Sequence, residues 1–177
     1  MKFIESHVVY KGKRVILEEA TYLDKKNNKQ VMEHVYVKPA VAILAITDQG
    51  NFVFIEERRT AINNQKILEM PAGLVEENES FKEAAIRELR EETGYVTDNV
   101  EFLTSYYSSC GFTNEKLYIF LASNLREKVS RNLDDAEEIN VKEIKKEDVF
   151  NMLKKGDICN ASSKVALMWY KLFKEEC

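Results

Sequence analysis

Residues 73–95, with the sequence GLVEENESFKEAAIRELREETGY, constrain this chain more than any other stretch. Ser80 and Glu83 have the Ser-x-x-Glu spacing of a capping box, which predicts that a helix begins at Phe81. Gly94 is placed to end that helix in the left-handed conformation, which glycine adopts at little steric cost. The stretch therefore predicts one helix of about three and a half turns.

This predicted helix carries acidic residues on the side that should be apolar. At about 100° per residue, Phe81, Ala85 and Leu89 align as a core-facing stripe. Glu88 and Glu92 point in nearly the same direction. Buried carboxylates are rare unless they are paired or bind a metal ion. Because hard oxygen ligands at this spacing suit Mg²⁺ or Mn²⁺, we expect a divalent cation beside the helix.

A solvated, glutamate-rich helix is the alternative, and it is the usual explanation of a charge run. The spacing argues against it. Gly73 and Glu79 precede REL-x-EE-x-GY at residues 87–95, with five residues in the first gap and seven in the second. This pattern resembles the Nudix box of the diphosphohydrolase superfamily. Tyr95 is the one unusual residue, because an aliphatic side chain is commoner in that place.

The first 37 residues predict a separate unit. Residues 3–10, 13–23 and 30–37 are rich in β-branched and aromatic residues and are separated by turn signals, which predicts an antiparallel three-stranded β-meander. Pro39 favours a boundary after this meander. In the ADP-ribose-hydrolysing branch of the resembled family a similar N-terminal unit mediates dimerisation, so the resemblance implies a homodimer.

The resemblance implies an α+β Nudix fold, in which a mixed β-sheet is sandwiched between helices (α/β/α). We expect the N-terminal meander over residues 1–38, as a dimerisation unit, and the Nudix catalytic domain over residues 39–177. The apolar run at 40–47 predicts a central strand covered on both faces, and Pro71 to Gly73 predict a tight turn. The other expected strands are 51–58, 66–69, 99–108, 115–123 and 138–146, and the other expected helices are 146–155 and 162–175.

By the same resemblance, the metal ligands are the main-chain oxygen of Ala72 and the carboxylates of Glu88, Glu91 and Glu92. The expected cofactor is Mg²⁺, with Mn²⁺ as a possible substitute. Arg87 flanks the cluster and is expected to orient these carboxylates.

The general base has two possible locations. Residues 132–140, with the sequence NLDDAEEIN, match the acidic loop that supplies the base in ADP-ribose hydrolysis, and Glu137 is the best-aligned acid, with Asp135 next. The alternative is that this loop is only a solvated turn. In that case the base belongs to the box, at Glu91 or Glu79.

Substrate contacts are expected on both sides of the box. Arg58 and Arg59 end a predicted strand, either as solubilising charges or as guanidinium groups for a phosphate, which their fork geometry suits. The resemblance favours Arg59 of the pair. It also adds Glu69, Gly73 and Glu115 as substrate-binding residues.

The loop at 109–118 bears on the substrate. Ser109, Gly111 and Glu115 match ADP-ribose pyrophosphatases, as do the next Leu-Tyr pair, but Cys110 stands where those enzymes have proline. We expect Mg²⁺-dependent cleavage of ADP-ribose to AMP and ribose 5-phosphate by a nucleoside diphosphate-sugar diphosphohydrolase. The alternatives are another nucleoside diphosphate sugar or a dinucleotide and, from a different class, a non-catalytic nucleotide-binding Nudix module.

Composition excludes several other classes. A net charge of −4, from 26 basic and 30 acidic residues, lacks the basic surplus that binds a nucleic acid polymer. The longest apolar run, residues 40–46, is too short to span a membrane, and we see no signal peptide. Three cysteines without metal-like or disulfide-like spacing favour a cytoplasmic location.

Overall fold

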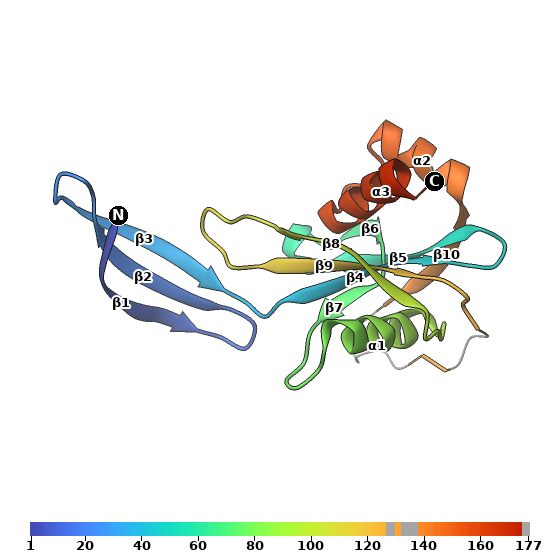
Figure 1. Cartoon of the computed structure of the whole chain (residues 1–177), viewed down its shortest axis with the longest axis horizontal. Coiled ribbons are helices and arrows are strands. Elements are labelled where there is room, and N and C mark those ends of the chain that lie inside the picture. The colour runs from blue at the N-terminus through green and yellow to red at the C-terminus, as the bar shows by residue number, and fades with distance from the viewer. Residues whose placement is uncertain (127–129, 132–137, 175–177) are drawn as a thin grey trace. The chain divides into compact units, whose positions relative to one another are not determined.

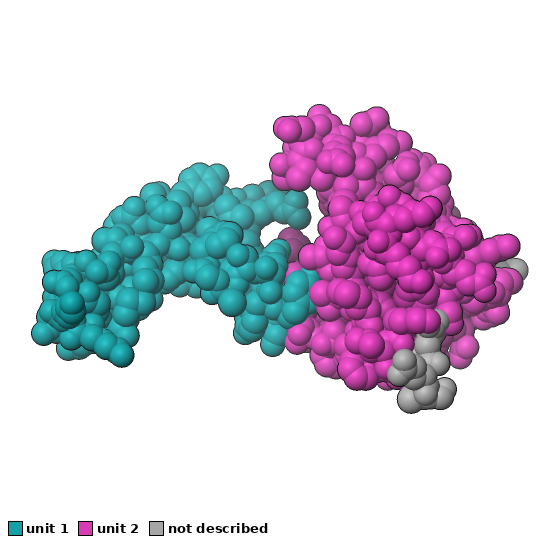
Figure 2. Space-filling view, turned by 90° about the horizontal axis from the view of Figure 1, so that it is seen from above, with its two compact units in different colours: residues 1–39, 106–116 teal, residues 40–105, 117–177 magenta. Residues whose placement is uncertain are grey.

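The computed structural model describes residues 1–126, 130–131 and 138–174 of the 177-residue chain. These residues form two compact units (Figure 2). The first comprises residues 1–39 and 106–116, and the second comprises residues 40–105 and 117–177.

The first unit contains the expected meander. Strands β1 (Lys2–Lys11), β2 (Ile16–Leu23) and β3 (Lys29–Tyr36) form an antiparallel sheet in the order β1-β2-β3. The turn between β2 and β3 is held by Asp24, whose carboxylate accepts hydrogen bonds from the amides of Lys26 (2.8 Å) and Asn28 (2.9 Å). The antiparallel three-stranded prediction is therefore confirmed.

A second segment, residues 106–116, completes this unit. The amide of Val35 donates to the carbonyl of Phe112 (2.8 Å), and the side chain of Asn114 accepts from the amide of Val37 (2.8 Å). The free side of β3 is thus bonded to a loop 70 to 80 residues further along the chain. Pro39, which favoured a boundary after the meander, gave no indication of this long-range partner.

The second unit is built on a seven-stranded mixed sheet. Its main path runs β10-β5-β4-β9-β8, with β6 paired to β5 and β7 paired to β4. Strands β4 and β9 are parallel, which makes the sheet mixed. The strands are β4 (Ala40–Ile46), β5 (Asn51–Arg59), β6 (Gln65–Glu69), β7 (Ala72–Leu74), β8 (Val100–Tyr107), β9 (Lys116–Ala122) and β10 (Asn140–Lys145).

Helices cover both faces of this sheet (Figure 1). Helix α1 (Phe81–Thr93) packs on β4 and β7, whereas α2 (Lys146–Lys155) and α3 (Ala161–Phe173) lie on the other face. Alternation along β5 explains the division: Val53 belongs to the core cluster under α1, while the ring of Phe52 meets Phe150 of α2 and Tyr170 of α3. The α/β/α prediction is confirmed.

Strand β4 lies at the centre of the sheet path, and its residues from Val41 to Ala45 are fully buried, as the continuous apolar run predicted. Their partners on α1 include Ala84 and Ala85, whose small side chains let the helix approach the sheet closely. Within the described ranges, no helix combines the length and the apolar character that crossing a bilayer requires.

One local prediction was wrong. The expected tight turn at residues 71–73 is instead the start of β7, where Ala72 pairs with Ala42 and Gly73 with Val41. Pro71 lacks an amide hydrogen, but its carbonyl accepts from the amide of Ile43 (2.8 Å) and so joins the ladder from the acceptor side. Proline and glycine indicated a break in the chain, but the partner strand lies about thirty residues earlier and leaves no local signal.

Candidate active site

Helix α1 begins and ends where its capping residues predicted. The hydroxyl of Ser80 accepts from the amide of Glu83 (3.2 Å), and the carboxylate of Glu83 accepts from the amide of Ser80 (2.8 Å), so the capping box is complete. Gly94 has φ of 80° and donates its amide to the carbonyl of Arg90. These two ends set the rotation of the helix and hence the direction of each glutamate.

One carboxylate of this helix is buried with the apolar residues. Ala85 and Leu89 are fully buried, and Glu92, on the same side, is only 5% exposed. Its Oε2 accepts a hydrogen bond of 2.9 Å from the amide of Ala72 on β7. The expectation that Glu92 lies on the core side of the helix is therefore met, and β7 supplies a polar partner for it.

A second carboxylate lies directly over the backbone of Gly73. A Cβ atom at this glycine would overlap the carboxylate group of Glu88, so any larger residue would displace that carboxylate. Glu88 and Glu92 are one helical turn apart, and they lie against neighbouring residues of β7, Glu88 over Gly73 and Glu92 at the amide of Ala72. The strand missing from the sequence prediction is thus the one that receives the box glutamates.

Arg87 joins the remaining acids of the box. Its guanidinium donates to Glu79 (2.8 and 2.9 Å), Glu88 (2.7 Å), Glu91 (3.0 Å) and the carbonyl of Leu74 (2.9 Å). The hydrogen bond to Glu79, with those to Glu88 and Glu91, raises the pKa of Arg87 against the opposing effect of burial. The same bond lowers the pKa of the Glu79 carboxyl below its ordinary value. Of the three carboxylates that Arg87 was expected to orient, it is bonded to Glu88 and Glu91, and it also bonds Glu79.

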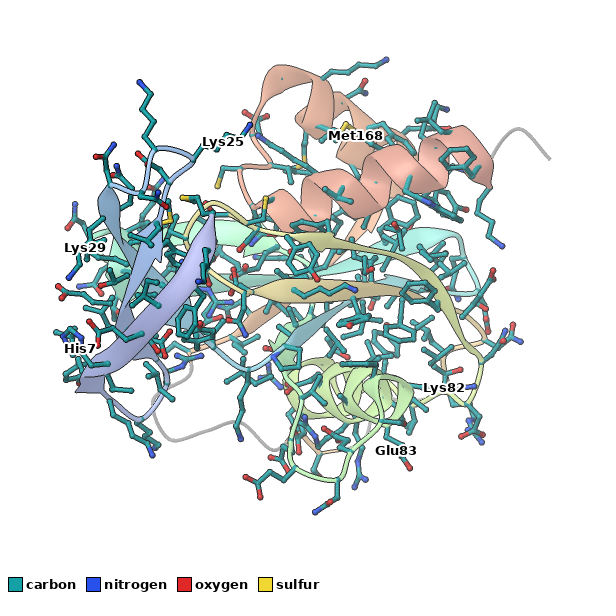
Figure 3. The ribbon with its side chains drawn as sticks, turned by 60° about the vertical axis from the view of Figure 1, so that its left-hand side comes forward. His7, Lys25, Lys29, Lys82, Glu83 and Met168 are labelled. Atoms are coloured by element: carbon teal, nitrogen blue, oxygen red, sulfur yellow. The ribbon has the colours of Figure 1, made fainter. Side chains whose placement is uncertain are left out.

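A cleft of about 690 Å³ opens beside this network. Helix α1 supplies most of its wall, and Figure 3 shows the side chain of Glu83, one of the lining residues, on the side of α1 turned away from the sheet. The lining residues are Asn78, Glu79, Glu83, Ile86, Arg87, Arg90, Glu91 and Ser130.

The structure brings the four predicted metal ligands close together only in part. Within residues 1–126, 130–131 and 138–174, no group of three or more His, Cys, Asp or Glu side chains is close enough to hold a metal ion. Arg87 bonds the carboxylates of Glu88 and Glu91, while Glu92 is bonded to the amide of Ala72. The donors are all hard oxygens and lie along one helix side and one strand, which suits Mg²⁺ or Mn²⁺ in chemistry.

Arg59 is held by two carboxylates near the box. Its Nε donates to Glu69 (2.7 Å), which is 3% exposed, and its Nη1 lies 3.0 Å from Glu57. Burial opposes the charge of Arg59, but the bond to Glu69 and the charges of Glu69, Glu57 and Glu92 outweigh it and raise its pKa. The influence of Glu92 places Arg59 in the electrostatic environment of the box.

Arg58 is separated from Arg59. Consecutive side chains of a strand point to opposite faces, and Arg58 is exposed, with its Nη1 donating to the carbonyl of Asn64 (3.2 Å) at the turn after the 3₁₀ helix Thr60–Ile62. Of the two arginines considered from the sequence, only Arg59 contacts the buried carboxylate Glu69.

Three other predicted residues are not among the contacts described above. Glu115 belongs to the first unit, where its amide donates to the hydroxyl of Thr113 (3.1 Å). Glu137 and Asp135, the predicted general bases of the acidic loop, lie outside the described residues.

Sequence reasoning missed two residues of this site. Glu57 is the second carboxylate on Arg59, and Asn160 donates from Nδ2 to Glu69 (2.8 Å). Asn160 had a recognisable signal, because asparagine directly before a helix is a favoured N-cap. Glu57 had none beyond the general charge at the end of its strand.

Comparison with known proteins agrees with the fold and the box. The NUDIX domain model matches residues 37–163. The ADP-ribose pyrophosphatase of Bacillus subtilis (strain 168) is 34% identical over 151 residues, which cover 84% of this chain and 78% of that protein. The methanol dehydrogenase activator of Bacillus methanolicus is 29% identical over 173 residues, or 97% of this chain and 92% of that one.

A solved structure supports the fold independently. The crystal structure of an ADP compounds hydrolase superposes with a TM-score of 0.88, covering 99% of this chain and 94% of the other at 21% identity. At that identity the likeness shows the fold alone.

Proposed function

Because this chain belongs to the NUDIX domain family, we propose that it is a nucleoside diphosphate-sugar diphosphohydrolase that cleaves ADP-ribose to AMP and ribose 5-phosphate. One relative, which is 34% identical over 84% of this chain, is an ADP-ribose pyrophosphatase. The proposal extends that relative's substrate to this chain.

One observation carries the proposal: Glu88 lies over Gly73 of β7, Glu92 accepts from the amide of Ala72 of the same strand, and Arg87 is bonded to Glu88. A diphosphate carries negative oxygens, so acids gathered on one surface need a cation before the substrate can approach. We assign Mg²⁺, with Mn²⁺ as substitute, to the main-chain oxygen of Ala72 and the carboxylates of Glu88, Glu91 and Glu92. When bound, such a cation screens the phosphate charge and lowers the pKa of a coordinated water.

The protein's own groups then have separate tasks. Arg59, held by Glu69, binds a phosphate through its guanidinium fork. Gly73 leaves the space in which the Glu88 carboxylate lies, and Arg87 keeps that carboxylate in place. Arg58 is a weaker candidate for phosphate binding, since it is bonded away from Glu69, and Glu115 is assigned to substrate binding by family resemblance.

A carboxylate must also accept the proton of the attacking water at one of its oxygens. We assign this role to Glu137, with Asp135 next, on their match to the acidic loop of the family. Glu91 and Glu79 are the alternatives within the box, and both are hydrogen-bonded to Arg87.

A second substrate class is another nucleoside diphosphate sugar or a dinucleotide. Cys110 supports it, because this residue replaces the proline typical of ADP-ribose pyrophosphatases. The name of the superposed structure, an ADP compounds hydrolase, is likewise broader than one substrate.

We further propose a cytoplasmic homodimer. Cys110 and Cys159 are free, exposed thiols, which suits a reducing compartment. For the dimer, β1 is an edge strand of the meander and every one of its residues is exposed, including Phe3 and Val8 (both 54%) and Tyr10 (57%). A second copy would cover these apolar side chains.

The test is chromatography of the products after incubation of the full chain with ADP-ribose and Mg²⁺. We expect equal amounts of AMP and ribose 5-phosphate, none of either in EDTA, and almost none from Glu92→Gln. Glu77→Gln, an exposed glutamate of the loop before α1, is the matched control and should be as active as wild type.

The same assay on a panel separates the alternatives. If another nucleoside diphosphate sugar or a dinucleotide were hydrolysed faster, that compound would be the substrate in place of ADP-ribose. If no diphosphate were cleaved with any divalent cation, the protein would be a nucleotide-binding module and the enzymatic proposal would fail.

A further inference from the structure

The N-terminus of α3 is capped by a side chain whose orientation is fixed. Oδ1 of Asn160 accepts from the amide of Ser163 (3.0 Å) and from the hydroxyls of Ser162 and Ser163. The backbone amide of Ser163 can only donate, so the amide nitrogen of Asn160 in this place would lose that hydrogen bond. The Nδ2 group of Asn160 must therefore point away from the helix.

That nitrogen donates to a buried acid. Nδ2 of Asn160 bonds Oε2 of Glu69 at 2.8 Å, and Oε1 of Glu69 accepts from Nε of Arg59 at 2.7 Å. The side chain of Glu69 is 4% exposed, while that of Arg59 is 36% exposed. The acid thus lies between a fixed, half-buried donor and a guanidinium that extends toward solvent.

The cap also holds the strand connection behind the site. Ser163, which is fully buried, accepts the amide of Met70 at its hydroxyl (3.0 Å). Met70 directly follows Glu69 and precedes the Pro71-Ala72-Gly73 segment. One helix terminus is therefore bonded to two consecutive residues that lead into β7.

We propose that Asn160 is a positioning residue for Arg59 and acts through Glu69. It keeps one oxygen of Glu69 occupied, so the other oxygen stays directed at Nε of Arg59. The guanidinium, whose Nη1 also pairs with Glu57, then presents its remaining N–H groups to the substrate phosphate. The catalytic consequence rests on the proposed function of Arg59, whereas the positioning itself is a property of the folded chain.

A helix cap without this second role is the competing explanation. Aspartate separates the two, because it caps a helix as well as asparagine does but cannot donate to Glu69. Asn160→Asp keeps the acceptors for Ser162 and Ser163 and places a carboxylate opposite Glu69. Asn160→Ser is the second variant, since it retains a capping oxygen and adds no charge beside the buried acid.

The kinetic test is a double-mutant cycle with Arg59→Ala. In the wild-type background we expect each Asn160 variant to lower kcat/KM by at least about tenfold, the usual size of losing a hydrogen bond to a charged group. In the Arg59→Ala background the same substitution should change kcat/KM by less than about twofold. Equal losses in both backgrounds would show that Asn160 acts on the fold alone and would overturn the proposal.

A spectroscopic test does not depend on turnover. The Nε–H signal of Arg59 in a ¹H–¹⁵N spectrum, assigned by its loss in Arg59→Lys, should shift and exchange faster with water in both Asn160 variants. An unchanged signal overturns the relay even if activity falls. If the wild type cleaves no diphosphate but this signal moves, the positioning stands and only the proposed function fails.

Discussion

At the scale of single residues, the site depends on how closely a side chain can approach a backbone. Glu88 reaches its position because Gly73 has no side chain, and Glu92 is held by one amide of the same strand. The core cluster is made of apolar side chains, among them those of β4, β9 and α1, and it includes neither glutamate. Residues at this point can therefore be changed with separate effects on activity and on folding.

Gly73→Ala tests this separation. The backbone of Gly73 lies outside the left-handed region, so alanine fits the local conformation, and the three atoms nearest its methyl group would all belong to the carboxylate of Glu88. A flexible carboxylate moves aside at small cost in stability. We expect kcat/KM to fall on the order of 10²-fold, since misplacement of a site group by about 1 Å has that effect, with a melting temperature within a few degrees of wild type.

The measurement is steady-state hydrolysis of ADP-ribose together with a thermal melt. Gly73→Ala/Glu88→Asp is the matched variant, because the shorter acid leaves room for the methyl group and should recover part of the loss. Wild-type kinetics in Gly73→Ala would show that the position of Glu88 over this strand is irrelevant to turnover.

Glu137→Gln tests the assignment of the general base. Removing a positioned base costs on the order of 10²–10⁴ in kcat, with little change in KM, and Asp135→Asn should be the milder substitution. Because hydroxide partly replaces a missing base, the deficit should shrink as pH rises from about 7 to 9. A deficit that is constant over this range would move the assignment to Asp135, and wild-type rates in both variants would place the base at Glu91 or Glu79.

At the scale of elements, Arg87 connects helix α1 to the segment that precedes it. The guanidinium donates to the carbonyl of Leu74 at the end of β7 and to both oxygens of Glu79 in the following loop. Capping by Ser80 starts the helix, but these bonds set how the loop between β7 and α1 lies against it. The relative placement of strand and helix therefore has an electrostatic component.

This electrostatic contribution predicts that the free energy of unfolding depends on pH. The bond from Arg87 depresses the pKa of Glu79 in the folded state, so the stabilisation is present above the ordinary glutamate pKa of about 4.3 and is lost as pH falls through the depressed value. In Glu79→Gln the free energy of unfolding should therefore decline less steeply below about pH 4.5 than in wild type. Urea unfolding at a series of pH values measures both slopes, with Glu77→Gln as the control, and parallel curves would contradict the coupling.

At the scale of the whole molecule, the two units differ in how they bury apolar surface. In the second unit, helices lie on both faces of the sheet and the central strand is inaccessible. In the first unit, by contrast, Phe3, Val8 and Tyr10 of β1 remain more than half exposed. A three-stranded sheet with that much apolar surface is stabilised by a further partner.

We predict that this partner is a second copy of the chain. Light scattering at micromolar concentration should give a mass of about 41 kDa, twice the 20.6 kDa of one chain. Replacing Val8 and Tyr10 together by lysine places charges on β1 and should reduce the mass to that of one chain while the second unit stays folded. A wild-type mass near 20.6 kDa would exclude the dimer.

The sequence alone determined the elements whose signals are local. The capping box at Ser80 and Glu83, the glycine at position 94 and the apolar run of β4 act within a few residues, so the bounds of α1 and the central place of β4 followed from them. The spacing of the acids over residues 73–95 likewise identified the box, because a family pattern is a property of the sequence itself.

Tertiary structure decided the contacts between segments far apart in the chain. Pairing of β7 with β4, the approach of Glu88 to Gly73 and the bond from Asn160 to Glu69 each join residues that are 15 to 91 positions apart, which no local pattern encodes. The different partners of Arg58 and Arg59, which follow from side-chain alternation at the end of β5, were likewise visible only in the structure. A helix follows from the few residues that start and stop it, but a site is assembled by packing, and packing depends on the whole chain.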